Sequence, residues 1–151
     1  MQKIINSEAE MMAMGEILGS FLLGGEVIEL VGDVGVGKTT LVKGIARGLK
    51  IEDVVQSPSF TISRLYKGRD NLNLAHYDFY RLNDAGIMEN EIEESTKDDM
   101  NIVIIEWGDP VSSILPTDKL TINIAATKES QRSVNLKAGG PRSQSLIGKM
   151  S

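Results

Sequence analysis

The sequence of 151 residues contains no cysteine and only one histidine. The lack of cysteine excludes disulfide bonds, thiolate nucleophiles and cysteine-ligated metal sites, and a lone histidine cannot build a multi-histidine metal centre. No apolar run approaches the ~18–20 residues that span a bilayer, and residues 1–6 lack the apolar core of a signal peptide. We therefore expect a cytoplasmic protein with no membrane partner.

Basic residues are also fewer than acidic residues. Sixteen basic and 21 acidic residues give a net charge of −5, so broad, non-specific binding to nucleic acid or to an anionic membrane is not expected. The composition of 41% hydrophobic and 25% charged residues is that of a globular chain. Its length favours one domain.

The patterned segments alternate between helix and strand. Ser7 and Glu10 form a capping-box pattern before an amphipathic helix. Residues 27–31 and 102–105 are short apolar runs typical of buried strands, and residues 84–100 fit a helix or a mobile loop. Hairpins are predicted over residues 60–80 and 120–136. We expect a domain over residues 1–138 and a frayed, flexible tail over 139–151.

A complete phosphate-binding pattern, Gly-x4-Gly-Lys-Ser/Thr, lies between the strand at 27–31 and a helix predicted over 38–49. In such a loop the backbone N–H groups and the helix N-terminus point at phosphate oxygens, the lysine reaches the outer phosphates and the hydroxyl binds magnesium. A plain glycine turn is the alternative, but the full pattern in this context favours triphosphate binding. The predicted nucleotide-binding residues are Gly32, Asp33, Val34, Gly35, Val36, Gly37, Lys38, Thr39 and Thr40, hereafter the phosphate loop.

This loop and the order of elements predict an α/β fold, a P-loop NTPase-like single domain with a mixed central sheet flanked by helices. A nucleotide site of this kind needs a second carboxylate that holds magnesium and orders water. Glu106 and Asp78 each follow a strand, where a sheet presents its ligand-binding edge. Either is a surface acid in the alternative interpretation, and which of them contacts the metal directly stays open.

Further candidates flank this edge. Ser57, Ser59 and Thr61 form a hydroxyl-rich loop that suits a γ-phosphate switch or a plain turn with a proline. Trp107 is the only tryptophan and is either a core residue or an anchor for a partner. His76 is interpreted as structural.

Four motifs in order resemble the bacterial TsaE (YjeE) family: residues 32–40 (GDVGVGKTT), 57–61 (SPSFT), 75–82 (AHYDFYRL) and 104–109 (IIEWGD). The resemblance runs from about residue 7 to residue 138. It implies an ATPase that uses ATP and Mg²⁺ and is needed to make N6-threonylcarbamoyladenosine in tRNA. In that family the partners are TsaB and TsaD, which modify adenosine 37, and tRNA is reached indirectly through the complex. ATP hydrolysis supports repeated turnover of that complex.

The resemblance also implies roles for single residues. Lys38, Thr39 and Thr40 would bind phosphate and magnesium, with Asp78 and Glu106 as the acids that complete catalysis and the metal site. Residues 57–61 would be a switch loop, Trp107 would lie near the partner or the nucleotide, and the stretch near residues 7–10 would lie near adenine. Ser59 stands where threonine is usual, and residues 85–99 and the tail have no clear counterpart.

Two other functions stay open at this stage. A small phosphotransferase uses the same loop, although the six arginines show no cluster that suits a closing lid. A nucleotide-gated adaptor with incidental hydrolysis is the second. No Asn-Lys-x-Asp segment for guanine occurs in the sequence, which favours ATP over GTP.

Overall fold

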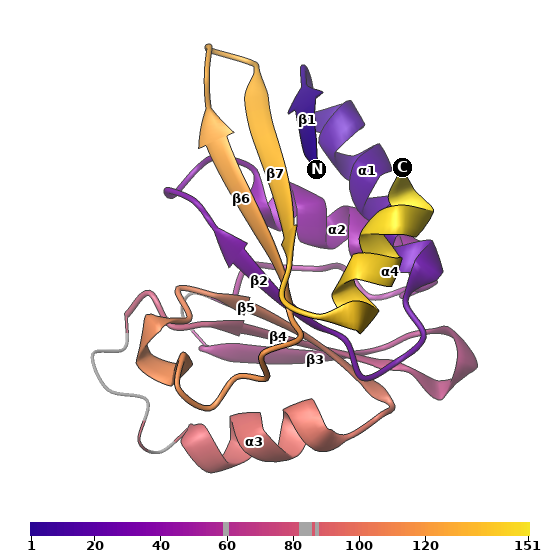
Figure 1. The fold of residues 1–151 in the computed structure, drawn as a ribbon, viewed down its shortest axis with the longest axis vertical. Helices are drawn as coiled ribbons and strands as arrows, with labels where there is room; N and C mark the ends of the chain where they lie inside the picture. The colour runs from indigo at the N-terminus through magenta and orange to yellow at the C-terminus, as the bar shows by residue number, and fades with distance from the viewer. Residues whose placement is uncertain (59–60, 82–85, 87) are drawn as a thin grey trace.

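A seven-stranded sheet in the order β1-β7-β6-β2-β5-β4-β3 forms the centre of the computed structural model (Figure 1). The structure describes residues 1–58, 61–81, 86 and 88–151. The strands are β1 (Gln2–Ile5), β2 (Val27–Val31), β3 (Ser63–Lys67), β4 (Asn73–Asp78), β5 (Asn101–Glu106), β6 (Leu120–Ala126) and β7 (Arg132–Ala138). β6, β2, β5 and β4 are parallel, while β1, β7 and β3 pair antiparallel.

Helices cover both faces of this sheet. α1 (Glu8–Phe21), α2 (Lys38–Gly48) and α4 (Pro141–Met150) contribute to one hydrophobic cluster, and α3 (Glu89–Lys97) to a second cluster on the opposite face (Figure 1). Two short 3-10 turns, η1 (Arg69–Asn71) and η2 (Asp109–Val111), connect strands. The predicted α/β fold with a mixed sheet is therefore confirmed. Among the described residues no helix is long and apolar enough to cross a membrane.

The C-terminal segment differs from the frayed tail expected from its small, polar residues. It forms α4, which buries Leu146, Ile147 and Met150 in the cluster that includes α1. The Asp118 carboxylate accepts hydrogen bonds from the N–H groups of Arg142 (2.8 Å) and Ser143 (3.0 Å) at the start of this helix. Ser143 adds a local contact by accepting from the Gly140 N–H at 3.2 Å, but Asp118 is far away in the sequence, and a local pattern does not reveal its part of the cap.

At the other end of the chain, Ser7 caps α1 as predicted, since its hydroxyl accepts a hydrogen bond from the Glu10 N–H at 3.1 Å. The reciprocal contact is shifted by one residue: the Glu10 carboxylate accepts from the N–H of Asn6 at 2.7 Å. Residues 84–100, where the sequence left helix and loop open, contain α3; residues 59–60, 82–85 and 87 lie outside the described residues.

Candidate nucleotide-binding site

The phosphate loop joins the end of β2 to the start of α2, in the middle of the parallel part of the sheet. Gly35 and Gly37 have φ angles of +86° and +109°, a region that glycine enters without a steric cost. Gly37 is also the N-cap of α2 and contributes no side-chain cap. The first N–H groups of α2 are therefore available to an anion, and the positive end of the helix dipole favours one there.

Lys38 lies buried at the first position of α2, with 7% of its surface exposed. Its ammonium donates a hydrogen bond to the Gly32 carbonyl oxygen at 2.5 Å and lies 3.9 Å from Oε1 of Glu106. It also lies 4.4 Å from the ring centroid of Trp107, a distance at which the ring attracts a cation. Three groups thus compensate this buried charge.

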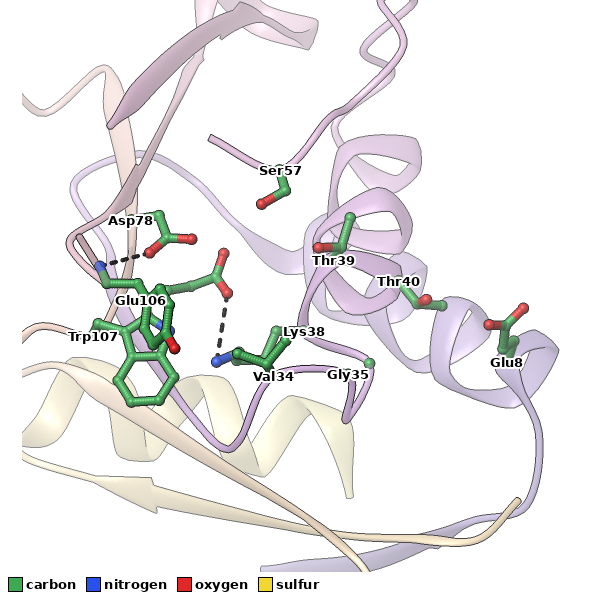
Figure 2. A pocket seen from close by; sticks show the side chains of 12 residues that line it. Glu8, Val34, Gly35, Lys38, Thr39, Thr40, Ser57, Asp78, Glu106 and Trp107 are labelled. Carbon is green, nitrogen blue, oxygen red and sulfur yellow. Dashed lines mark hydrogen bonds and ion pairs between the residues drawn. The ribbon is translucent and has the colours of Figure 1, made fainter. Parts of the chain in front are cut away.

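Asp78 and Glu106 are neighbours because β4 and β5 pair in parallel with these two residues in register. Both side chains are buried, with 5% and 3% exposed. Asp78 accepts a hydrogen bond from the Tyr80 N–H at 2.9 Å, and Oε2 of Glu106 lies 2.6 Å from Nε2 of His76. Figure 2 shows both carboxylates facing the phosphate loop.

Trp107 and Tyr80 form an aromatic wall beside these acids, with ring centroids 4.9 Å apart. Trp107 has a φ of +56°, which is uncommon for a bulky residue. Such backbone conformations cluster at functional sites. Here this conformation accompanies an indole ring that lies against the ammonium of Lys38 (Figure 2).

These groups surround a cavity of about 290 Å³. Its lining combines one ammonium, three carboxylates and three aliphatic hydroxyls with the aromatic wall and the phosphate-loop backbone. The lining residues are Glu8, Val34, Gly35, Gly37, Lys38, Thr39, Thr40, Ser57, Asp78, Tyr80, Glu106 and Trp107. A second cavity adjoins it between the start of α1, the phosphate loop and the β6–β7 hairpin.

The family model for "Threonylcarbamoyl adenosine biosynthesis protein TsaE" matches residues 5–134. The chain belongs to the TsaE family. A TsaE protein of Bacillus subtilis is 34% identical over 99% of this chain and 92% of its own length, and one of Nostoc is 40% identical over 72% of this chain and 69% of its own. The crystal structure of Bacillus subtilis YdiB superposes with a TM-score of 0.82 at 29% identity, covering 99% of this chain and 93% of that one.

The family predicted from four ordered motifs is thus confirmed, and with it a P-loop-type nucleotide-binding protein. The structure brings most predicted site residues to the main cavity. Val36 instead lines the second cavity, and Gly32 and Asp33 line a smaller cavity that Trp107 also lines. Ser59 lies outside the described residues. Thr61 lies away from the main cavity, where its hydroxyl donates to the Ser63 carbonyl at 3.2 Å.

Tyr80 in the main cavity and Arg132 in the second were not predicted from the sequence, nor were Met11, Glu129 and Ser130 in the second, whereas Glu8 belongs to the stretch near residues 7–10 that the resemblance places near adenine. Arg132 donates from Nε to the Val36 carbonyl in the phosphate loop at 3.1 Å. Its position 96 residues away from Val36 leaves no local signal. Glu8 did have a local signal in the sequence, because it stands in the first turn of the helix after the predicted cap at Ser7.

The donor set at the cavity fits a magnesium ion held together with a nucleotide. The described residues contain no cluster of three or more His, Asp or Glu side chains that would hold a metal without further ligands. Mg²⁺ prefers oxygen ligands and is usually bound through one or two carboxylates, phosphate oxygens and water. The Thr39 hydroxyl and the carboxylates of Asp78 and Glu106 supply that limited number of oxygen atoms at the same cavity.

Proposed function

We propose that this protein binds ATP with Mg²⁺ in the main cavity and hydrolyses it to ADP and phosphate. The observation that carries the proposal is the position of Lys38: its ammonium lies at the N-terminus of α2, 3.9 Å from the Glu106 carboxylate, with Asp78 and Thr39 lining the same cavity. A cation and a helix N-terminus bind phosphate oxygens, and an adjacent carboxylate orients water.

In the proposed reaction Lys38 exchanges the Gly32 carbonyl for the outer phosphates. Thr39, with Asp78 or Glu106, would hold a magnesium ion, which when bound would neutralise charge on the phosphates. The remaining carboxylate accepts a hydrogen bond from the attacking water. The water oxygen bonds to the γ-phosphorus while the bond from that phosphorus to the β–γ bridging oxygen breaks. ADP leaves, and the proton of the water passes to the released phosphate.

The biological role follows from the family. The relatives carry the name tRNA threonylcarbamoyladenosine biosynthesis protein, and we assign this chain the same pathway, the formation of N6-threonylcarbamoyladenosine at position 37 of tRNA. Its ATP hydrolysis would support repeated turnover by TsaB and TsaD, and tRNA would be reached through that complex. Residues 57–61 would act as the switch that changes affinity for the partners after hydrolysis.

The first experiment measures Mg²⁺-dependent ATP hydrolysis by the chain alone and with purified TsaB and TsaD. Lys38→Ala should lose ATP binding, and removal of one such contact lowers turnover by roughly 10²–10³-fold. Lys43→Ala is the matched control, because Lys43 lies exposed on the same helix and away from the cavity. Ordinary ATP affinity and turnover in Lys38→Ala would refute the site.

Nucleotide binding is followed separately through fluorescence. Trp107 is the only tryptophan, and its ring lies 4.4 Å from the ammonium of Lys38. ATP that draws Lys38 away from the ring should change the emission of the wild type. An unchanged spectrum at ATP concentrations that saturate hydrolysis would contradict this movement of Lys38.

Glu106→Ala distinguishes the ATPase from an adaptor. An ATPase that drives the pathway should retain ATP binding and lose both hydrolysis and modified tRNA, whereas an adaptor should keep forming modified tRNA. The phosphotransferase alternative gains no support from the main cavity, since no arginine is among its described lining residues. Transfer of labelled γ-phosphate to an acceptor other than water would establish it.

A further inference from the structure

His76 is completely buried on β4, directly below the two acids of the proposed site. Its Nε2 atom lies 2.6 Å from Oε2 of Glu106, a short distance typical of a hydrogen bond to a charged group. Asp78 follows two residues later on the same strand, so the side chains of His76 and Asp78 point to the same face of the sheet. His76 therefore contacts Glu106 from the protein interior and is not among the residues that line the main cavity.

The other ring nitrogen, Nδ1, has no hydrogen-bond partner among the described residues. Across the β3–β4 ladder His76 pairs with Arg64, whose buried Nε also has no partner. The carboxylate of Glu106 accepts and does not donate, so Nε2 carries the proton of this hydrogen bond and donates it to Oε2. Nδ1 is also shielded from solvent.

This contact fixes which oxygen of Glu106 faces the cavity. Oε2 is occupied by His76, and Oε1 is the atom that lies 3.9 Å from the ammonium of Lys38. A carboxylate on a flexible glutamate side chain otherwise samples several rotamers, and second contacts of this kind keep a functional group in its working orientation.

We propose that His76 is a positioning residue for the hydrolysis: its Nε2–H holds Glu106 so that Oε1 faces Lys38 and the cavity in which ATP would be hydrolysed. The proposal rests on the proposed ATPase function. It differs from a purely structural role, in which any side chain of similar volume would serve, and from general-base catalysis, in which His76 would have to exchange a proton with the substrate.

Three substitutions separate these roles. In His76→Gln the amide nitrogen is the same number of bonds from Cβ as Nε2 is, so the donor is retained without a titrating ring. His76→Asn is the matched control, because its shorter amide cannot reach Glu106. His76→Leu replaces the imidazole with an apolar side chain of similar size, so the volume is retained and the donor is lost. We expect kcat to fall by about 10–100-fold in His76→Asn and His76→Leu, the usual effect of losing such a contact, while KM for ATP stays near the wild-type value and His76→Gln recovers most of the loss.

Wild-type kcat in folded His76→Asn or His76→Leu would overturn the proposal, and so would a His76→Gln variant as slow as His76→Asn. A parallel fall in ATP affinity, measured by Trp107 fluorescence, would indicate a general disturbance of the site and would also overturn it.

A second measurement does not depend on activity. The thermal midpoints of the wild type, His76→Leu, Glu106→Ala and the double variant form a cycle on the nucleotide-free protein. The thermal midpoint of the double variant should fall by less than the sum of the two single decreases, because each single change leaves a buried polar group without its partner. Additive losses would overturn the contact itself. If the wild type hydrolyses no ATP while the cycle is non-additive, the proposed function fails and the His76–Glu106 contact stands.

Discussion

The close packing of α1 on α2 places the first turn of α1 beside the phosphate loop, and one glycine tests how it is maintained. A Cβ atom added to Gly15 would lie 2.4 Å from the Leu41 carbonyl oxygen and 2.9 Å from the Gly44 Cα. Both are backbone atoms of α2, so no side-chain rotation relieves the contact. The helices would have to separate by about 1 Å to restore an ordinary van der Waals distance.

Two contributions set the change in the free energy of unfolding that Gly15→Ala causes. Alanine is favoured over glycine inside a helix by roughly 1 kcal/mol. Overpacking costs about 1–3 kcal/mol, and contact with backbone atoms puts this position at the upper end. We expect a net loss of about 2 kcal/mol in the free energy of unfolding, and for a chain of this size that lowers the thermal midpoint by roughly 4–8 °C.

Gly148→Ala is the matched control, because a Cβ atom there meets nothing within 4 Å and the residue is also helical. Only the higher helix propensity of alanine acts at this position, so the free energy of unfolding of Gly148→Ala should equal that of the wild type or exceed it by up to about 1 kcal/mol. Urea denaturation and calorimetry measure both variants. A Gly15→Ala protein as stable as Gly148→Ala would show that the helices separate freely and would refute the reasoning.

Other predictions concern groups outside the cavity and the tryptophan reporter. Arg69 donates to the carbonyls of Gly19, Ser20, Leu22 and Gly48 at the ends of α1 and α2, so Arg69→Ala should lower the urea-derived free energy of unfolding by about 2 kcal/mol, and an equally stable variant would contradict this. For Asp118, partial burial raises the pKa but is outweighed by hydrogen bonds from Ser143 and Arg142 and by the Arg142 charge, which together lower the pKa. Because the folded-state pKa is the lower one, its stabilisation is present above the unfolded pKa and is lost as the pH falls through the folded value. Asp118→Asn should therefore flatten the acidic limb of the stability curve, and an unchanged limb would refute the assignment. Lys38→Met should shift the Trp107 emission of the nucleotide-free protein, because it removes the cation at 4.4 Å from the ring; an identical spectrum would argue against that contact.

Local patterns in the sequence were sufficient for most of the fold. The strand at residues 27–31 and the helix after the phosphate loop appear at nearly the predicted bounds as β2 and α2, because apolar period and glycine boundaries act within one segment. The prediction of a frayed tail over residues 139–151 was wrong for the opposite reason. Its helix depends on Asp118 and on apolar contacts with distant elements, and none of these is visible in residues 139–151 alone.

The candidate site also combines residues that local patterns predict with contacts that depend on distant parts of the chain. The phosphate loop was predicted because its residues are contiguous, and Asp78 and Glu106 because each follows a strand. Their actual adjacency depends on the β4–β5 register, which pairs them directly. A shift of one residue would turn one of the two side chains to the other face of the sheet. His76 was interpreted as structural from the sequence. Its hydrogen bond to Glu106 spans 30 residues, so no local pattern reveals it.

In this structure three neighbouring groups balance the buried charge of Lys38. A buried, unpaired ammonium would be costly, and here a carbonyl oxygen, a carboxylate at 3.9 Å and an aromatic face share the compensation. The carbonyl contact is the one that phosphate oxygens would replace in the proposed reaction. Because Glu106 is held independently by His76, the lysine could turn to the nucleotide while the carboxylate keeps its place. In the proposed reaction the site would thus combine one movable partner, Lys38, with one fixed partner, Glu106.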